Sequence, residues 1–408
     1  MSALTSNQSA SRLTFTTAVG LKFSRHLSQS LILPSLPAIM IGLKAPQNMT
    51  QLVVGSFIVG MVVAKLIVIF LADYLGMRKT LLIMLPLLLL GSLLCITPQI
   101  EILLLGRTLQ GIGIGGASAI GITIIKDSTP HQAYVKKMAQ WAIWVEWAPP
   151  LALLLGGFVQ HWLGWRYNFL IVCIVSLVLI LLALISLPKK EPSSTPHPGL
   201  KATLVSLRSG FQNKQFVAYS LMYSFIVSGQ IVFYTISPFY LIHTLGMPAD
   251  DYGIALMPYF AALILGAASL DFLKRSFSST QVLRLALLFG LLGALAILIL
   301  STVEVSSVLA LILPMALYGL CHSILGLEVE IKVSHFFSET PVANLGLLGL
   351  NLAIISSIIA ITAAHTPSAT VNYLGLFLLA LVLLSFTATL FLDTDALKTE
   401  GLSEKHTV

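Results

Sequence analysis

Twelve apolar segments of about 20 residues run through this sequence, and they leave few choices of fold. A helix needs about 20 mostly apolar residues to cross a bilayer, where only helices and closed barrels satisfy their backbone hydrogen bonds. Turn residues or charges separate the segments. The chain is therefore predicted to be an all-α membrane protein of twelve transmembrane helices. The predicted spans are 18–41, 51–72, 80–97, 101–125, 138–160, 166–187, 215–242, 252–272, 281–301, 306–328, 342–363 and 371–392.

The composition excludes most other classes of protein. Of the 408 residues, 57% are hydrophobic and only 10% are charged, whereas about 25% are charged in soluble domains. The net charge of +7 is typical of cytoplasmic loops and does not indicate a nucleic-acid partner. The sequence contains no GxxxxGK[ST] loop, no metal-binding spacing and no Ser/His/Asp arrangement. We therefore expect no enzyme activity and no cofactor or metal.

One polar stretch divides the chain. Residues 188–214 are rich in Lys, Ser and Pro and can sustain neither a core nor a membrane helix. The predicted domains are a six-helix bundle over 1–187, a cytoplasmic linker over 188–214, and a second six-helix bundle over 215–408 with a short cytoplasmic tail. Three acidic and basic residues, Glu328, Glu330 and Lys332, are predicted to mark the inner end of the tenth span.

The distribution of Lys and Arg predicts the orientation, because cytoplasmic loops carry an excess of both. With the N-terminus inside, seventeen of these residues fall in inner loops and tails, and only Lys44 and Arg166 fall in outer loops. Both termini are therefore predicted to be cytoplasmic. The seventeen are Arg12, Arg78, Lys79, Lys126, Lys136, Lys137, Lys189, Lys190, Lys201, Arg208, Lys214, Lys274, Arg275, Arg284, Lys332, Lys398 and Lys405.

Three local motifs stand between or within the first spans. Residues 71–79, LADYLGMRK, place Asp73, Arg78 and Lys79 in a short inner loop, where a charge network can form in one conformation and break in another. Residues 107–113, RTLQGIG, start a span with an arginine and follow it with small residues that favour close packing. Residues 148–157, APPLALLLGG, indicate a helix with prolines and paired glycines.

Together these motifs resemble the major facilitator superfamily and its drug:proton antiporters. The likeness is closer to the bicyclomycin/chloramphenicol-resistance branch, through LPSLP at 33–37, TQL at 50–52, KD at 126–127 and GWRYNF at 164–169. The resemblance implies two six-helix bundles, alternating access, and proton-driven export across a bacterial inner membrane, and we expect a monomer. It also implies a proton-transfer role for Arg107 and gating roles for Asp73, Arg78 and Lys79. One departure is Ser30, which stands where relatives carry an acidic residue.

Ionisable side chains inside predicted spans are costly and are therefore candidates for function. Lys22, Arg25, His26 and Gln29 share one helical face, which could line a site for an anionic substrate or, for Lys22 and Arg25, reach back to the inner surface. Lys65 lies deep in the second span, and Glu146 is the carboxylate expected to pair with it. This pair is either structural or part of a proton-coupling network with Arg107.

Aromatic and amide residues mark the second half. Tyr219, Tyr223, Gln230 and Tyr234 share a face of the seventh span, as a substrate wall or as packing aromatics. His322 is a candidate proton relay or a helix contact, and Asn344 and Asn351 either line a cavity or join helices. The predicted proton-coupling residues are Glu146, Arg107 and His322. The predicted substrate-binding residues are Arg25, His26, Gln29, Lys65, Tyr223, Gln230 and Tyr234.

Three functions are compatible with these residues. The first is a proton-coupled exporter of small molecules such as drugs. The second is a dedicated transporter, in either direction, of an anionic metabolite or a polycarboxylate siderophore, because the polar residues of the first half are mostly cationic. The third is a membrane receptor that transports nothing. In the first two cases the partners are a small-molecule substrate, protons and the lipid bilayer.

Overall fold

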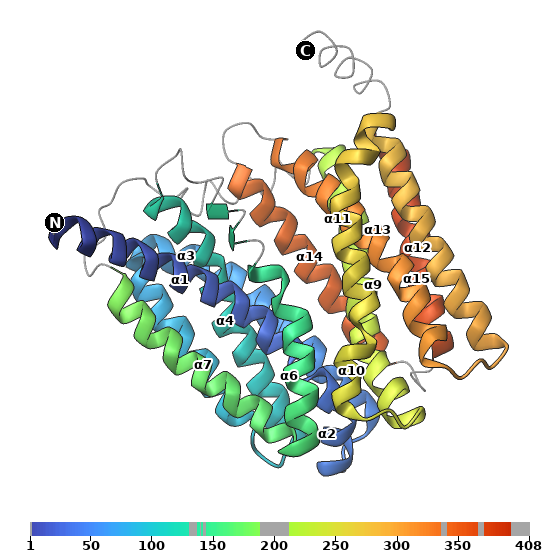
Figure 1. Ribbon diagram of the computed structural model, residues 1–408, viewed down its shortest axis with the longest axis horizontal. Coiled ribbons are helices and arrows are strands. Elements are labelled where there is room, and N and C mark those ends of the chain that lie inside the picture. Colours follow the sequence, from blue (N-terminus) through green and yellow to red (C-terminus); the bar gives the residue numbers. More distant parts are fainter. Residues whose placement is uncertain are drawn as a thin grey trace, which may run out of the picture. The chain divides into compact units, whose positions relative to one another are not determined.

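The computed structural model describes residues 2–129, 137–138, 140–141, 144–187, 212–335, 341–365 and 371–392, and all its regular elements there are helical (Figure 1). The chain forms two compact units. Unit 1 contains Met1–Lys201 and Leu241–Ile254, and unit 2 contains Ala202–Tyr240 and Ala255–Val408. Most of the predicted linker lies outside the described residues, so its boundaries stay a prediction.

Ten helices in the described residues are long and apolar enough to cross a membrane. The other two predicted spans are not among these ten helices. The first is broken into α1 (Ser2–Ser30), the 3-10 turn η1 (Leu33–Ser35) and α2 (Leu36–Gly42), because prolines in its LPSLP motif interrupt helical hydrogen bonding. The fifth runs partly over residues that the structure does not describe, and its remaining helix α6 (Ala148–Trp162) has 15 residues.

Unit 1 contains a long pair of helices that replaces the predicted inner loop. Helix α3 (Gln47–Leu94) continues through 71–79 with a sharp kink at Gly76, whose φ of 78° favours glycine. The two predicted spans are present as Gln47–Val68 and Tyr74–Leu94, and a kink at Gly76 takes the place of the predicted loop between them. Helices α4 (Ile100–Ser128) and α7 (Trp165–Ser186) complete the core of unit 1.

Glycines bring α3 and α4 into backbone contact. A Cβ atom added to Gly60 would collide with the backbone oxygen of Thr108, and one added to Gly111 would collide with that of Phe57. Small residues at such positions allow membrane helices to approach closely, and dispersion contacts then stabilise the pair. The RTLQGIG motif thus contributes the close α3–α4 packing that its small residues predict.

A segment from later in the sequence belongs to unit 1. The chain leaves α9 (Lys214–Pro238) through the π-helical turn η2 (Phe239–Thr244) and forms α10 (Ala249–Ala255). Helix α10 lies against α6, where a Cβ on Gly157 would collide with Ala249 and one on Gly253 would collide with Leu154. Nδ1 of His161 lies 3.2 Å from Oδ1 of Asp250.

Unit 2 is built from long helices with polar contacts between them. They are α9, α11 (Met257–Ser276), α12 (Ser279–Thr302), α13 (Val308–His335), α14 (Pro341–Ala364) and α15 (Val371–Ala388), followed by the 3-10 turn η3 (Thr389–Phe391). Helix α13 packs against α11 and α12, and α9 packs against α14 and α15. Ser228 and Ser356 join α9 to α14 through their hydroxyls at 3.1 Å.

Candidate functional site

Arg107 is the most completely bound polar residue of unit 1. Its side chain is 1% exposed. Its Nε donates to the carbonyl of Val53 at 3.1 Å, and its Nη1 donates to the carbonyl of Ser28 at 2.9 Å and to Oε1 of Gln110 at 2.8 Å. The guanidinium lies 4.3 Å from the centre of the Phe57 ring. Arg107 therefore joins α1, α3 and α4 at one point.

The contacts of Arg107 continue into a chain of neutral hydrogen bonds. Nε2 of Gln110 donates to Oγ of Ser92 at 2.7 Å, and that hydroxyl donates to the carbonyl of Leu88 at 2.7 Å. The guanidinium of Arg107 contacts backbone carbonyls, an amide oxygen and an aromatic ring. These fixed dipoles surround it and keep it oriented. The network connects the two arms of α3 on either side of the Gly76 kink.

Cations gather on α1 as the sequence predicts for this face. Nη2 of Arg25 donates to Nε2 of His26 at 2.6 Å, and Nη1 of Arg25 lies 4.0 Å from Sδ of Met61. An imidazole nitrogen that accepts from a guanidinium carries no proton, so His26 is neutral in this arrangement. Lys22 lies 5.8 Å from the centre of the Trp141 ring.

Electrostatic contacts extend this group to Lys65 and Glu146. Lys22 and Arg25 both lie within electrostatic range of Glu146, and Arg25 lies within range of Lys65. The described residues contain no ion pair between Lys65 and Glu146, and the charges that act on Glu146 are Lys22 and Arg25 of α1. Glu146 is exposed, as are the neighbouring Trp144 and Trp147. Gln29 is half-buried on the same α1 face.

Three motifs that carry the resemblance meet at one residue. Nδ2 of Asn168, from GWRYNF, donates to Oγ of Ser35 in LPSLP at 2.9 Å and to the carbonyl of Gly156 in the glycine pair at 3.1 Å. A Cβ on Gly156 would collide with the carbonyl of Leu31. The break in the first span is thus fixed in place by α6 and α7.

The predicted gating residues have separate positions. Nη2 of Arg78 donates to the carbonyl of Leu184 at 3.0 Å, which ties the kinked region of α3 to the end of α7. Lys79 is exposed. The side chain of Asp73 lies outside the part that the structure describes, so its predicted network with Arg78 stays a prediction.

In unit 2 one residue of the predicted aromatic face of α9, Tyr223, lies beside His322. The ring centres of Tyr223 and His322 are 6.1 Å apart, and a hydrogen bond of 3.3 Å joins Nδ1 of His322 to the hydroxyl of Tyr259. Nε2 of Gln230 donates to the hydroxyl of Tyr234 at 3.1 Å, while Tyr234 itself is 3% exposed. The structure therefore brings together Tyr223 and His322, with an unpredicted Tyr259.

Tyr219 of the predicted α9 face is buried, with 5% of its surface exposed. Nδ2 of Asn351 donates to Oγ of Ser220 at 3.0 Å, so Asn351 joins α14 to α9. The side chain of Asn344 falls outside the described residues.

Sequence reasoning missed the buried carboxylate of unit 2. Glu328 is 0% exposed, and its Oε2 lies 3.1 Å from Nζ of Lys274. That Glu328 marks the inner end of the tenth span stays a prediction, whereas its pairing with Lys274 of α11 was not predicted. The signal that could have found it is the Lys274–Arg275 pair at the end of a neighbouring span.

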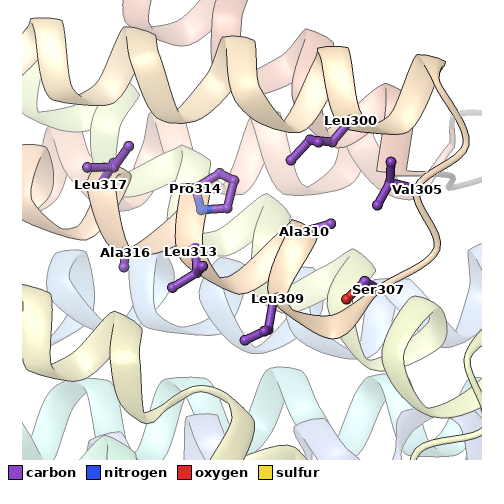
Figure 2. Close-up of a pocket in the computed structure, with 9 residues that line it drawn as sticks. All are labelled: Leu300, Val305, Ser307, Leu309, Ala310, Leu313, Pro314, Ala316 and Leu317. Atoms are coloured by element: carbon purple, nitrogen blue, oxygen red, sulfur yellow. The ribbon is translucent and has the colours of Figure 1, made fainter.

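A shallow groove lies where α12 ends and α13 begins (Figure 2). Its volume is about 640 Å³, and its lining is aliphatic apart from Ser307. The lining residues are Leu300, Val305, Ser307, Leu309, Ala310, Leu313, Pro314, Ala316 and Leu317. None of the predicted site residues lies in it. This aliphatic lining is typical of a lipid-facing surface, so we do not assign the groove as a substrate site.

Comparison with known proteins identifies the family. The sequence model of the Major Facilitator Superfamily matches residues 19–337, well over half of the 408-residue chain. The chain belongs to the Major Facilitator Superfamily. A D-xylose-proton symporter has the same fold, with a TM-score of 0.75, 16% identity, and coverage of 93% of this chain and 96% of that one. The predicted all-α membrane fold of the superfamily is confirmed.

Relatives with known names are transporters. The chloramphenicol resistance protein CraA of Acinetobacter baumannii is 29% identical over 254 residues, which are 60% of this chain and 59% of that protein. The multidrug transporter MdfA of Edwardsiella ictaluri is 25% identical over 293 residues, 69% of this chain and 68% of that protein. The match with CraA therefore covers less than two thirds of the length of that protein. These names agree with the drug:proton antiporter branch that the motifs predict.

Proposed function

We propose that this member of the superfamily is a proton-coupled exporter of small molecules, of the multidrug type, that works by alternating access in a bacterial inner membrane. It acts as a monomer with both termini in the cytoplasm. The observation that carries the proposal is the buried Arg107, whose motif is that of the antiporter branch and whose contacts join α1, α3 and α4. The relatives named for chloramphenicol resistance and multidrug transport support it.

Proton coupling needs a group that can gain and lose a proton as substrate leaves and binds. Glu146 is the candidate in unit 1, because Lys22 and Arg25 are the charges that act on it and substrate that displaced either cation would change its proton affinity. Arg107 holds the helices of that region in place. His322, beside Tyr223 and Tyr259, is the candidate in unit 2.

The cations of α1 favour a second candidate substrate class. Arg25 and Lys65, with His26 and Gln29 on the same α1 face as Arg25, offer donors to a carboxylate or phosphate group, and cationic sites attract anions. Tyr223, Gln230 and Tyr234 would supply stacking and hydrogen bonds to an uncharged part. Dedicated transport of an anionic metabolite or a polycarboxylate siderophore, in either direction, is therefore the alternative. Asp73, Arg78 and Lys79 gate the cycle in both cases.

The test expresses the protein in a bacterial strain from which the main efflux pumps have been deleted. We expect increased resistance to chloramphenicol, and loss of that resistance for Glu146→Gln at equal membrane abundance. Glu101→Gln is the matched control, because Glu101 is an exposed carboxylate in the first turn of α4. Unchanged resistance in the Glu146 variant would remove it from the mechanism.

The anionic alternative is tested with purified protein in liposomes. Labelled citrate and chloramphenicol are each offered under an imposed pH gradient, and Arg25→Ala is compared with Arg284→Ala, an exposed arginine of α12. Uptake of citrate that depends on Arg25, without any movement of chloramphenicol, would replace the multidrug assignment by the anionic one.

A further inference from the structure

His322 of α13 lies beside two tyrosine rings of unit 2. A hydrogen bond of 3.3 Å joins its Nδ1 to the hydroxyl of Tyr259 on α11, and the ring centre of Tyr223 on α9 lies 6.1 Å from that of the imidazole. A Cβ atom on Gly319, one turn before His322, would lie 3.1 Å from the ring of Tyr259. One on Gly326, one turn after it, would lie 2.7 Å from the ring of Tyr223. These two glycines make room for the rings, and we call Tyr223, Tyr259 and His322 the histidine cluster.

Tyr259 is the buried member of the histidine cluster. It is 0% exposed, and its ring centre lies 5.8 Å from that of Phe233 and 5.5 Å from that of Phe260. These aromatic neighbours hold its ring in place. Among the described residues, Nδ1 of His322 is the one hydrogen-bond partner of its hydroxyl. The packing of Tyr259 therefore fixes the point at which this hydroxyl meets the imidazole.

Burial decides which atom donates in this hydrogen bond. If Nδ1 of His322 donated, the proton of the Tyr259 hydroxyl would have no acceptor among the described residues, and a buried donor without an acceptor is costly. If the hydroxyl donates, both groups are satisfied. A neutral imidazole carries its one proton on the nitrogen that does not accept. The arrangement therefore favours an imidazole with its proton on Nε2.

The Nε2 atom of His322 is the accessible end of the histidine cluster. It has no hydrogen-bond partner in the described part of the chain, and it is not among the fully buried polar atoms there. His322 and Tyr223 are both half-buried, whereas Tyr259 is completely covered. The accessible side of the cluster therefore offers an N–H donor next to an aromatic ring.

We propose that Tyr259 is a positioning residue for substrate specificity: it donates to Nδ1 and so presents His322 as an Nε2–H donor beside the ring of Tyr223. The substrate class that fits is an aromatic compound with a hydrogen-bond acceptor on its ring, such as a nitro or carbonyl oxygen. The ring stacks on Tyr223, and the acceptor binds Nε2–H. A substrate with only N–H donors at that point places donor against donor and is rejected. This inference rests on the proposed transport and specifies its substrate.

The first experiment needs no substrate. Purified protein with ¹⁵N-labelled histidine is measured by NMR, and the signals of His322 are assigned from their loss in His322→Gln. We expect a protonated Nε2 and an Nδ1 that accepts a hydrogen bond. Tyr259→Phe should shift the Nδ1 signal to that of a nitrogen without a donor. A protonated Nδ1 in the unmodified protein, or an Nδ1 signal unchanged in Tyr259→Phe, would overturn the proposal.

The chain contains a matched control for Tyr259. Tyr318 of α13 is also 0% exposed, and its hydroxyl donates to the backbone carbonyl of Ile226 at 2.9 Å. Tyr318→Phe therefore removes a buried tyrosine hydroxyl from the same unit without removing a partner of His322. It should leave the Nδ1 signal of His322 where it is.

The second experiment measures specificity by counterflow in liposomes. Chloramphenicol, which carries a nitro group on its ring, is compared with the analogue in which that group is reduced to an amine. The unmodified protein should favour the nitro compound. Tyr259→Phe should raise the KM for chloramphenicol by about tenfold, the value of one oriented hydrogen bond, with little change in maximal rate. Tyr318→Phe should keep the KM. A preference for nitro over amine that is equal in Tyr259→Phe and the unmodified protein would overturn the proposal.

The two experiments also separate this inference from the proposed function. If the unmodified protein moves neither chloramphenicol nor citrate, the proposed transport fails, while the NMR signals still decide whether Tyr259 positions His322. If Tyr259→Phe does not fold, Gly319→Ala displaces the ring of Tyr259 and keeps its hydroxyl. That variant should also shift the Nδ1 signal, with Gly346→Ala as the control because nothing lies within 4 Å of its added Cβ. An unchanged signal in Gly319→Ala would again overturn the proposal.

Discussion

Arg107 in unit 1 and Glu328 in unit 2 are both buried charges, but they are stabilised in different ways. Arg107 donates to two backbone carbonyls and one amide oxygen and packs against one aromatic ring. Glu328 has one ion-pair partner, Lys274, and no hydrogen bond of good geometry in the described residues. Dipoles from several helices hold the guanidinium in one orientation, whereas the carboxylate is held by one side chain of a neighbouring helix. The comparison separates a charge fixed by three helices from one that depends on a single ion pair.

The helix pairs also differ in how they pack. Between α3 and α4, Gly60 and Gly111 place two backbones in direct contact, and Gly293 does the same between α12 and α13 in unit 2. Between α9 and α14, side-chain hydroxyls form the contact, as in Ser228 with Ser356. Backbone contact tolerates no added atoms, while side-chain hydrogen bonds can be exchanged for others. We therefore expect substitutions at the contact glycines to be the more damaging.

The largest expected effect is that of Arg107→Met. It leaves the carbonyls of Ser28 and Val53 without their donor in an apolar interior, at about 1–3 kcal/mol for each. Unfolding in detergent should show a loss of about 3 kcal/mol, with little dependence on pH, and driven transport should disappear. Unchanged stability of the Arg107 variant would contradict its role in joining α1, α3 and α4.

Next in size is Gly111→Ala. Its Cβ would overlap the carbonyl of Phe57, so α3 and α4 must separate, which costs about 1–3 kcal/mol in a well-packed interior. The matched control in unit 2 is Gly346→Ala, where nothing lies within 4 Å of an added Cβ. That control should be neutral or stabilised by up to about 1 kcal/mol, because alanine favours helix. Equal losses at the two positions would contradict the difference in packing.

A smaller loss is expected for Asn168→Ala. It removes the donor to Ser35 and Gly156 that fixes the break in the first span, at about 1–2 kcal/mol. Thermal unfolding measures the loss, and Asn48→Ala, on an exposed amide, is the control. If transport falls more than stability does, the break has a role in the cycle. If neither transport nor stability changes, the hydrogen bonds of Asn168 are not what fixes the break in the first span.

The smallest effect is that of Ser278→Ala at the start of α12. Ser278 and Gln281 form a capping box, and loss of an N-cap serine costs about 1 kcal/mol. We expect a small loss of stability, measured by thermal unfolding in detergent. An unchanged melting temperature would mean that the capping box does not stabilise α12.

The sequence was sufficient for the spans and the family, but not for the pairing of charges. Apolar length predicts a membrane helix directly, and RTLQGIG indicated both Arg107 and the close α3–α4 packing. The predicted ion pair of Lys65 and Glu146 is absent from the described residues, because the depth of a residue along its helix does not indicate which helix faces meet. Glu328 was missed because a charge near Glu330 and Lys332 resembles a helix end, and only the position of α11 buries it. The kink that takes the place of the predicted loop at 71–79 was not predicted, because the backbone conformation of Gly76 cannot be inferred from residue type alone.

The contact of α10 with α6 has a practical consequence for anyone who divides this chain. Cutting the gene within 188–214 would give two fragments that match the predicted domains, yet Leu241–Ile254 would then travel with the wrong fragment. The first fragment would display the bare Gly157 face of α6 and lack Asp250 beside His161. Chimeras that exchange the first half should therefore exchange Leu241–Ile254 with it, because these two pieces of sequence have to be compatible with each other.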